Sequence, residues 1–207
     1  MIKNIIFDLG GVILDLDSRE AMRRFEALGL REPEKYLGPY GQQGMFLDFE
    51  TGRLSLEELT EEFSRTTGCE VSPVEMQHAW MGFIARTDEA KLRNIDALAR
   101  DYDIYLLSNT NPAIMMWAES PEFSETGRPL SSWFRKMYLS FRMGMAKPGR
   151  EIFEALIADA GIDPAETVFV DDGAANVATA RELGFHTLQP LNATDWMPQL
   201  AGMLRSL

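Results

Sequence analysis

Short apolar runs in this sequence are followed by polar side chains that could carry out metal-assisted group transfer. Asp8 follows the run at residues 2–7, and Asp171 and Asp172 follow the run at residues 168–170. A carboxylate at such a turn can act as a nucleophile or as a metal ligand. If these acids converge, they repel one another unless a cation lies between them. Oxygen donors without nearby histidine or cysteine favour Mg²⁺ over zinc.

Two other segments could bind an anion. Ser108 and the backbone amides that follow it precede a predicted helix near Pro112, and a helix N-terminus attracts anions. Lys147 supplies a positive charge directly before Pro148, which opens the next predicted helix. A nucleophile, a metal ion, a hydroxyl group and a lysine are the components that phosphoryl transfer requires, because its catalysis consists largely of positioning and charge neutralisation.

The elements that must position these groups alternate along the chain. Short apolar runs predict buried strands at residues 2–7, 104–107, 137–139, 168–170 and 185–188. Amphipathic patterns predict helices at residues 89–100, 150–160 and 174–183. This alternation predicts an α/β fold with a Rossmann-like parallel sheet and helices on both faces. Ligands bind beyond the carboxyl ends of such strands, so the polar clusters are expected to converge there.

A block of helices interrupts the alternation after the first strand. Helical patterns lie at residues 19–28, 42–50, 56–67 and 73–85. Ser55 with Glu58, and Ser72 with Glu75, have the spacing of capping boxes. We therefore expect residues 17–86 to form an inserted helical-bundle cap, and residues 1–16 and 87–207 to form the α/β core.

The composition of the chain disfavours some classes of binding partner. The chain has 207 residues and a net charge of −12. This charge disfavours nucleic acid and anionic membranes, because both attract basic surfaces. No apolar stretch approaches the length of a membrane span. The single cysteine, Cys69, allows no internal disulfide and is typical of a reduced compartment, so a cytoplasmic location is expected.

The polar segments, in their order along the chain, resemble the four motifs of the haloacid-dehalogenase (HAD) superfamily. The segments are Asp8-Leu9-Gly10-Gly11-Val12, Leu107-Ser108-Asn109-Thr110-Asn111, Lys147-Pro148 and Val170-Asp171-Asp172. The helical block lies where this family carries its first type of cap. The pattern is most similar to the branch of sugar-phosphate phosphatases that includes α-D-glucose-1-phosphate phosphatase. The resemblance covers essentially the whole chain.

The resemblance implies a role for each motif. Asp8 attacks phosphorus and forms an aspartyl-phosphate, which water then hydrolyses. Mg²⁺ is held by the Asp8 carboxylate, the Gly10 carbonyl and Asp172, with Asp171 bound directly or through water. The implied substrate is a small phosphorylated metabolite.

The resemblance also implies groups that bind the phosphate. Ser108 and the Asn109 amide bind the phosphoryl oxygens, and Lys147 neutralises charge on Asp8 and on the phosphate. Asn111 either contacts the substrate or caps a helix. Asn176 is expected to support the site through hydrogen bonds.

One position departs from the pattern of many family phosphatases. Their second residue after the nucleophile is an aspartate that protonates the leaving alkoxide, whereas this chain has Gly10. A glycine offers a carbonyl to the metal but cannot transfer a proton. Asp15 and Asp17 are candidates by proximity in sequence, although a hinge residue and a helix cap are the favoured interpretations.

The sequence favours a Mg²⁺-dependent phosphatase, with two alternatives. A 2-haloacid dehalogenase uses an aspartate nucleophile without metal, but such a site has no use for Asp171 and Asp172. A weakly active binding or regulatory protein is suggested by Gly10. Retention of Asp8, Ser108, Lys147 and both paired acids argues against it.

Overall fold

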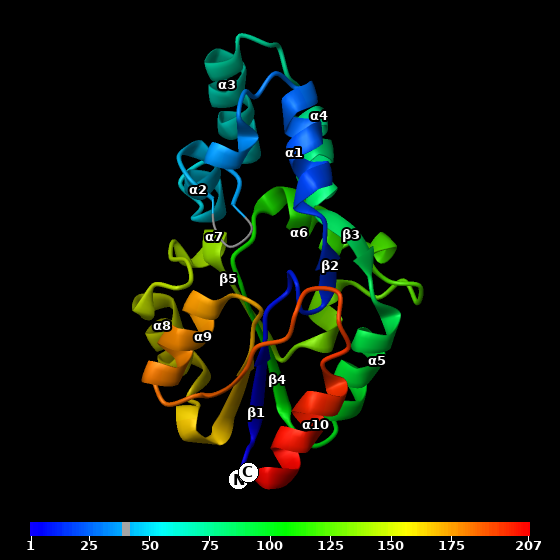
Figure 1. The fold of residues 1–207 in the computed structure, drawn as a ribbon, viewed down its shortest axis with the longest axis vertical. Helices are drawn as coiled ribbons and strands as arrows, with labels where there is room; N and C mark the ends of the chain where they lie inside the picture. Colours follow the sequence, from blue (N-terminus) through cyan, green and yellow to red (C-terminus); the bar gives the residue numbers. More distant parts are fainter. Residues whose placement is uncertain (39–41) are drawn as a thin grey trace.

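A five-stranded parallel sheet forms the centre of the molecule (Figure 1). The computed structural model describes residues 1–38 and 42–207. The strand order is β5-β4-β1-β6-β7, and all neighbouring strands pair in parallel. The strands are β1 (Asn4–Phe7), β4 (Asp103–Ser108), β5 (Lys136–Leu139), β6 (Thr167–Val170) and β7 (His186–Leu188). The predicted α/β fold is therefore confirmed.

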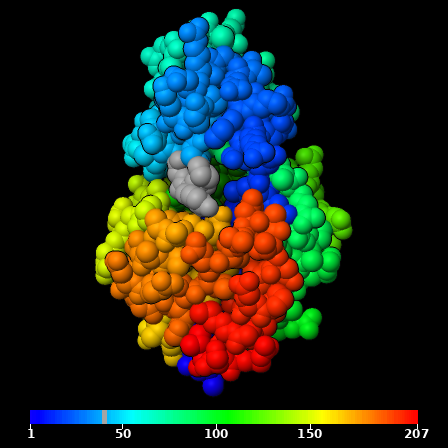
Figure 2. Space-filling view, in the orientation of Figure 1, coloured from blue at the N-terminus to red at the C-terminus, as the bar shows by residue number. Residues whose placement is uncertain are grey.

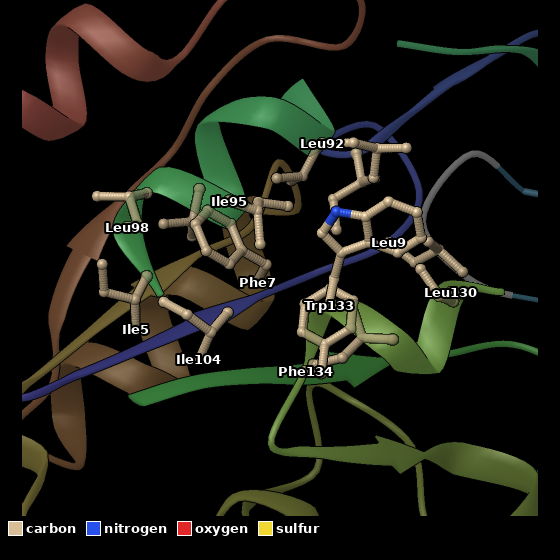
Figure 3. Packing of buried hydrophobic residues seen from close by; sticks show 14 of the residues in the cluster. Ile5, Phe7, Leu9, Leu92, Ile95, Leu98, Ile104, Leu130, Trp133 and Phe134 are labelled. Carbon is tan, nitrogen blue, oxygen red and sulfur yellow. The ribbon is translucent and has the colours of Figure 1, made fainter. Parts of the chain in front are cut away.

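Alternating side chains of β1 fill two separate apolar layers. Ile5 and Phe7 belong to the layer under α5 (Glu89–Leu98) and α10 (Met197–Ser206), whereas Ile6 belongs to the layer under α8 (Arg150–Ala160) and α9 (Ala174–Glu182). Figure 3 shows Ile5 and Phe7 packed with Ile95 and Ile104 in the first layer. A parallel strand that is buried on both faces has a continuous apolar sequence, which explains why β1 could be predicted from the sequence.

The core helices surround this sheet on both faces. They are α5 (Glu89–Leu98), α6 (Pro112–Ala118), α7 (Ser140–Met143), α8 (Arg150–Ala160), α9 (Ala174–Glu182) and α10 (Met197–Ser206). The bounds of α8 are those predicted, because Gly149 precedes it and Gly161 ends it in a left-handed conformation. Helix α10 was not predicted from the sequence. Short 3-10 helices lie at Pro33–Lys35, Met81–Phe83, Pro121–Phe123, Leu130–Trp133 and Pro164–Glu166.

Four further helices form a separate unit beyond the carboxyl ends of the strands (Figures 1 and 2). They are α1 (Ser18–Ala27), α2 (Met45–Glu50), α3 (Leu56–Thr67) and α4 (Pro73–Trp80). Their apolar faces meet around Phe25, Phe46, Phe63 and Trp80. Both predicted capping boxes are present, at Ser55 and at Ser72. None of the described helices is long and apolar enough to cross a membrane.

The helix predicted over residues 73–85 is wrong in its second half. Helix α4 ends at Trp80, and residues Ile84–Thr87 form strand β3, which pairs antiparallel with β2 (Leu14–Leu16). Between them the chain passes close to α1, where a Cβ at Gly82 would lie 2.8 Å from Ala21 Cα. The two-stranded ribbon β2–β3 therefore carries the chain into and out of the helical unit.

Candidate active site

The polar segments that are separate in sequence meet at one cavity beyond the strand ends. The core side of the cavity is lined by Asp8, Gly10, Ser108, Asn109, Asn111, Lys147, Asp172 and Asn176. The helical unit contributes Gln42, Glu50, Trp80 and Phe83 to the same lining. Strands β4, β1 and β6 are neighbours in the sheet, which is why motifs far apart along the chain converge.

Asp8 is held at the end of β1 with its carboxylate almost enclosed. Its Oδ1 accepts a hydrogen bond from the Leu9 amide at 2.7 Å, and lies 3.0 Å from Lys147 Nζ. Burial raises the pKa of Asp8 to about 7, although the positive charge of Lys147 acts in the opposite direction. The negative charges of Asp171 and Asp172 raise this pKa further. A neighbouring cation would therefore favour the ionised form that a nucleophile requires.

Lys147 lies between the carboxylates. Its Nζ is 2.6 Å from Asp171 Oδ2 and 2.9 Å from the Leu107 carbonyl oxygen, in addition to its contact with Asp8. Burial disfavours the charged amine, but Asp171 and Asp8 outweigh that effect and raise the pKa of Lys147. The Asn109 side chain fixes the backbone of Lys147 through two hydrogen bonds of 2.8 Å.

The two adjacent aspartates have different surroundings. Asp171 is fully buried, and its oxygens accept hydrogen bonds from Lys147, the Gly173 amide and Asn176 Nδ2. The supporting role expected for Asn176 is thus confirmed in this structure. Asp172 is partly exposed to the cavity; burial and the charge of Asp171 raise its pKa to about 6, against the effect of Lys147.

The arrangement of acids fits a hard divalent cation. Carboxylate oxygens of Asp8, Asp171 and Asp172 all lie within 4.8 Å of one another. Burial and the neighbouring acids raise the pKa of Asp8 and of Asp172, so a further positive charge would favour the ionised form of both carboxylates. A set of oxygen donors with this charge suits Mg²⁺, since that ion binds carboxylates and retains several waters.

Ser108 and Asn111 line the cavity from the segment after β4. Ser108 is buried, and its hydroxyl donates a long hydrogen bond of 3.3 Å to the Asn109 carbonyl oxygen. Asn111 caps α6, because its Oδ1 accepts a hydrogen bond from the Ile114 amide at 3.1 Å. The other end of this side chain, Nδ2, is buried without a hydrogen-bond partner among residues 1–38 and 42–207.

Asp15 and Asp17 have structural partners outside the cavity. Asp17 caps α1 by accepting hydrogen bonds from the amides of Arg19 and Glu20. Asp15 lies on β2 and forms ion pairs with Lys91 at 2.8 Å and Arg86 at 2.7 Å. Neither residue lines the cavity, and the interpretation of Asp17 as a helix cap is confirmed. The hinge role of Asp15 stays a prediction.

The helical unit contributes polar residues to the cavity that were not predicted from the sequence. Glu50 is the last residue of α2 and is buried against the cavity. Burial raises its pKa to about 8; the Gln42 side chain opposes this effect, and the charge of Asp8 adds to it. A signal was present, because an acid in the last turn of a helix opposes the helix dipole and indicates another constraint.

Fold and site together define an HAD-like hydrolase. The family model described as haloacid dehalogenase-like hydrolase matches residues 2–184. Since this match covers most of the chain, the protein belongs to that family.

Two relatives are similar to this chain over almost its full length. The chain is 46% identical over 206 residues to a D-ribitol-5-phosphate phosphatase from Bacteroides thetaiotaomicron, with 100% of both chains covered. A predicted HAD-like family hydrolase from Porphyromonas gingivalis has a TM-score of 0.95 and 47% identity, covering 99% of this chain and 98% of its own.

A third relative was solved with ligands. It is an HAD family enzyme from B. thetaiotaomicron, in a variant with one aspartate replaced by alanine, complexed with magnesium and inorganic phosphate. It has a TM-score of 0.91 and 36% identity, covering 97% of this chain and 99% of that one.

Proposed function

We propose that this protein is a Mg²⁺-dependent phosphatase that hydrolyses a small phosphomonoester, with sugar and alditol phosphates as the substrate class. One observation carries the proposal: three carboxylates lie within 4.8 Å of one another, beside a buried lysine. The D-ribitol-5-phosphate phosphatase that matches the whole chain supports this substrate class. The related enzyme complexed with magnesium and inorganic phosphate supports the metal requirement.

The metal site is assigned to Asp8, the Gly10 carbonyl and Asp172. Asp171 is better placed to act through a water molecule, because both its oxygens already accept hydrogen bonds from protein donors. A bound Mg²⁺ supplies positive charge that offsets the phosphoryl oxygens and the clustered acids. This assignment is consistent with the raised pKa of Asp8 and Asp172.

Asp8 is the nucleophile in this mechanism. One of its carboxylate oxygens attacks phosphorus, the bond from phosphorus to the leaving oxygen breaks, and an aspartyl-phosphate forms. The leaving oxygen takes its proton from solvent. Water then attacks this phosphorus, the bond from phosphorus to the Asp8 oxygen breaks, and inorganic phosphate leaves with the Asp8 carboxylate restored. Ser108 and the Asn109 amide bind phosphoryl oxygens, and Lys147 offsets their charge beside Asp8. Gly10 has no proton to give to the leaving oxygen.

We infer that residues 17–86 act as a cap on a core made of residues 1–16 and 87–207. The helical unit has its own apolar cluster, and the cavity lies between it and the strand ends. A cap in this position excludes water from the phosphoryl group. Because the substrate is a phosphorylated metabolite, we expect the enzyme to act in the cytoplasm.

The alternative functions are less consistent with the site. A metal-free dehalogenase for a carboxylate substrate would not benefit from two additional acids beside its nucleophile. A weakly active regulatory protein has no need for the buried ion pairs that Lys147 makes with Asp8 and Asp171.

Phosphate release from p-nitrophenyl phosphate and from a panel of sugar and alditol phosphates tests the proposal. We expect release that requires Mg²⁺, stops with EDTA and is abolished in Asp8→Asn. Asp101→Asn, at an exposed turn, serves as the matched control and should retain activity. Absence of release from every compound, by protein that still binds Mg²⁺, would favour the regulatory alternative.

A further inference from the structure

Three buried polar atoms without hydrogen-bond partners belong to side chains that line the cavity. They are Gln42 Oε1, Trp80 Nε1 and Asn111 Nδ2. Among the described residues only one other side-chain atom, Trp133 Nε1, shares this property, and Trp133 does not line the cavity. Buried polar groups are rarely left unpaired, because each lost hydrogen bond is unfavourable. Their concentration at one cavity indicates that a ligand supplies the partners.

The two donors among these atoms are held in place by the structure. Asn111 is 1% exposed, and the hydrogen bond of its Oδ1 to the Ile114 amide fixes the side chain. Trp80 is also 1% exposed, and its ring lies between 5.6 and 5.7 Å from the rings of Phe25, Phe46, Phe49 and Phe83. Helix α4 contacts α6, where Gln77 Nε2 donates to the Ala113 carbonyl oxygen at 3.3 Å. Both N–H groups are therefore oriented before a ligand binds.

The charge of the cavity indicates which ligand groups it accepts. Lys147 is the one cation among its described lining residues, and it is already paired with Asp8 and Asp171. Glu50 adds a carboxyl group with no basic side chain within ion-pair distance in the described part of the chain. A second anionic group on the substrate would be buried here without a partner.

We propose that Gln42, Glu50, Trp80 and Asn111 form a subsite that binds the uncharged, hydroxyl-bearing end of the substrate and excludes a second anionic group. This inference rests on the proposed phosphatase function and adds the part of the site that selects the substrate. A hydroxyl group can donate to Gln42 Oε1 and accept from Trp80 Nε1 or Asn111 Nδ2, so a chain of hydroxyls matches both kinds of unpaired atom. A compound that lacks the hydroxyls would leave these buried atoms unpaired when it binds, so the subsite also disfavours such compounds.

Three substrates of equal chain length test the subsite: a pentitol 5-phosphate, n-pentyl phosphate without hydroxyl groups, and the matching aldonate with a carboxylate in place of the terminal CH₂OH. The measured quantity is kcat/KM for each, and the specificity is the ratio of pentitol to pentyl ester. We expect the wild type to prefer the pentitol by at least about tenfold over both other compounds.

Two variants each remove one donor. Asn111→Ser keeps a capping oxygen for α6 and loses the amide N–H, and Trp80→Phe loses the indole N–H. We expect each to lower the ratio of pentitol to pentyl ester by at least about fivefold. Trp133→Phe is the matched control, since it removes the same group from a buried Trp away from the cavity; its ratio should equal that of the wild type.

Glu50→Gln tests the exclusion of anions. At pH 9, above the pKa of about 8 that burial gives Glu50, its carboxyl group is ionised; the substitution keeps the size of the side chain and removes this negative charge, so we expect the kcat/KM of the aldonate relative to the pentitol to rise by at least about fivefold at that pH. If the ratios of Asn111→Ser, Trp80→Phe and Glu50→Gln all match the wild type while Asp8→Asn abolishes release, the subsite is refuted and the phosphatase stands. Release from none of the three compounds by a wild type that still hydrolyses p-nitrophenyl phosphate would overturn the subsite alone, and absence of release from p-nitrophenyl phosphate as well would overturn the phosphatase function.

Discussion

Lys147 and Asp171 form an ion pair that is closed to solvent, with 2.6 Å between Nζ and Oδ2 and side chains only 1% and 0% exposed. Asn176 donates to the same carboxylate at 3.0 Å. Asp171 therefore holds Lys147 beside Asp8, whereas its neighbour Asp172 faces the cavity. Two adjacent acids of one motif have different tasks in this arrangement.

Replacing each acid by asparagine should separate those tasks. Asp171→Asn breaks a buried pair, and we expect the free energy of unfolding in EDTA to fall by about 3 kcal/mol. Asp172→Asn removes a repelling charge, so we expect stability at pH 8 in EDTA to rise by about 1 kcal/mol, with at least about tenfold more Mg²⁺ needed for half-maximal activity. Chemical denaturation measures the change in stability, and Mg²⁺ titrations of activity measure the metal requirement. Equal effects from the two variants would contradict the different roles assigned to Asp171 and Asp172.

Gly11 should be essential for the placement of Asp172. Its φ of +73° disfavours other residues, and a Cβ there would collide with the Asp172 carboxylate. We expect Gly11→Ala to lower stability by about 1–2 kcal/mol and to raise the Mg²⁺ concentration for half-maximal activity. Gly68→Ala is the control, because Gly68 has φ +72° and nothing within 4 Å. It should lose similar stability without any change in Mg²⁺ dependence.

Glu50 should make the stability of the metal-free protein depend on pH. Its pKa of about 8 in the folded state exceeds that of an unfolded chain, so the folded state holds the proton more tightly. This stabilisation is complete below the ordinary glutamate pKa of about 4.3 and is lost as the pH rises through 8.

The matching measurement is the free energy of unfolding in EDTA from pH 5 to pH 9. Relative to Glu50→Gln, the wild type should lose on the order of 3 kcal/mol over this range. Glu61→Gln, on the exposed face of α3, should follow the wild-type curve. If the free energy of unfolding depends on pH in the same way for the wild type and Glu50→Gln, the pKa of Glu50 is not raised in the folded protein.

Trp196 should stabilise the segment that follows the nucleophile. Its Nε1 donates to the Val12 carbonyl oxygen at 2.9 Å, and its ring lies 5.0 Å from that of Phe7. Trp196→Phe leaves that buried oxygen unpaired, so we expect a loss of about 1 kcal/mol beyond that of Trp133→Phe, whose Nε1 has no partner. Thermal denaturation of both variants gives the difference, and kcat should fall only in Trp196→Phe.

Most of the core could be predicted from sequence because its signals are local. A buried parallel strand is an apolar run, and α8 lies between Gly149 and Gly161, so both were found without tertiary information. Strand β3 was mistaken for helix because its pairing with β2 involves residues about seventy positions earlier in the chain. Such a pairing leaves no trace in a short window of sequence.

The residues of the site also differ in whether they could be predicted from the sequence. Asp8, Ser108 and the paired acids lie at or directly after strand ends, so their convergence could be predicted from the parallel arrangement of the strands. Gln42, Glu50 and Trp80 reach the cavity only through the packing of α2 and α4 over the strand ends. Their positions depend on contacts between elements, which the sequence pattern of a single helix does not encode.

The ribbon formed by β2 and β3 has a consequence for how this fold diversifies. Leu14 pairs with Thr87, so the chain enters the helical unit and comes back from it at neighbouring points. Closing a loop between two such points depends only weakly on its length, so the sheet places little restriction on what is inserted there. The inserted helices can therefore be lengthened, shortened or replaced without changing the residues of the core that bind phosphate. The ribbon is the position at which a different helical unit, with a different substrate specificity, can be inserted.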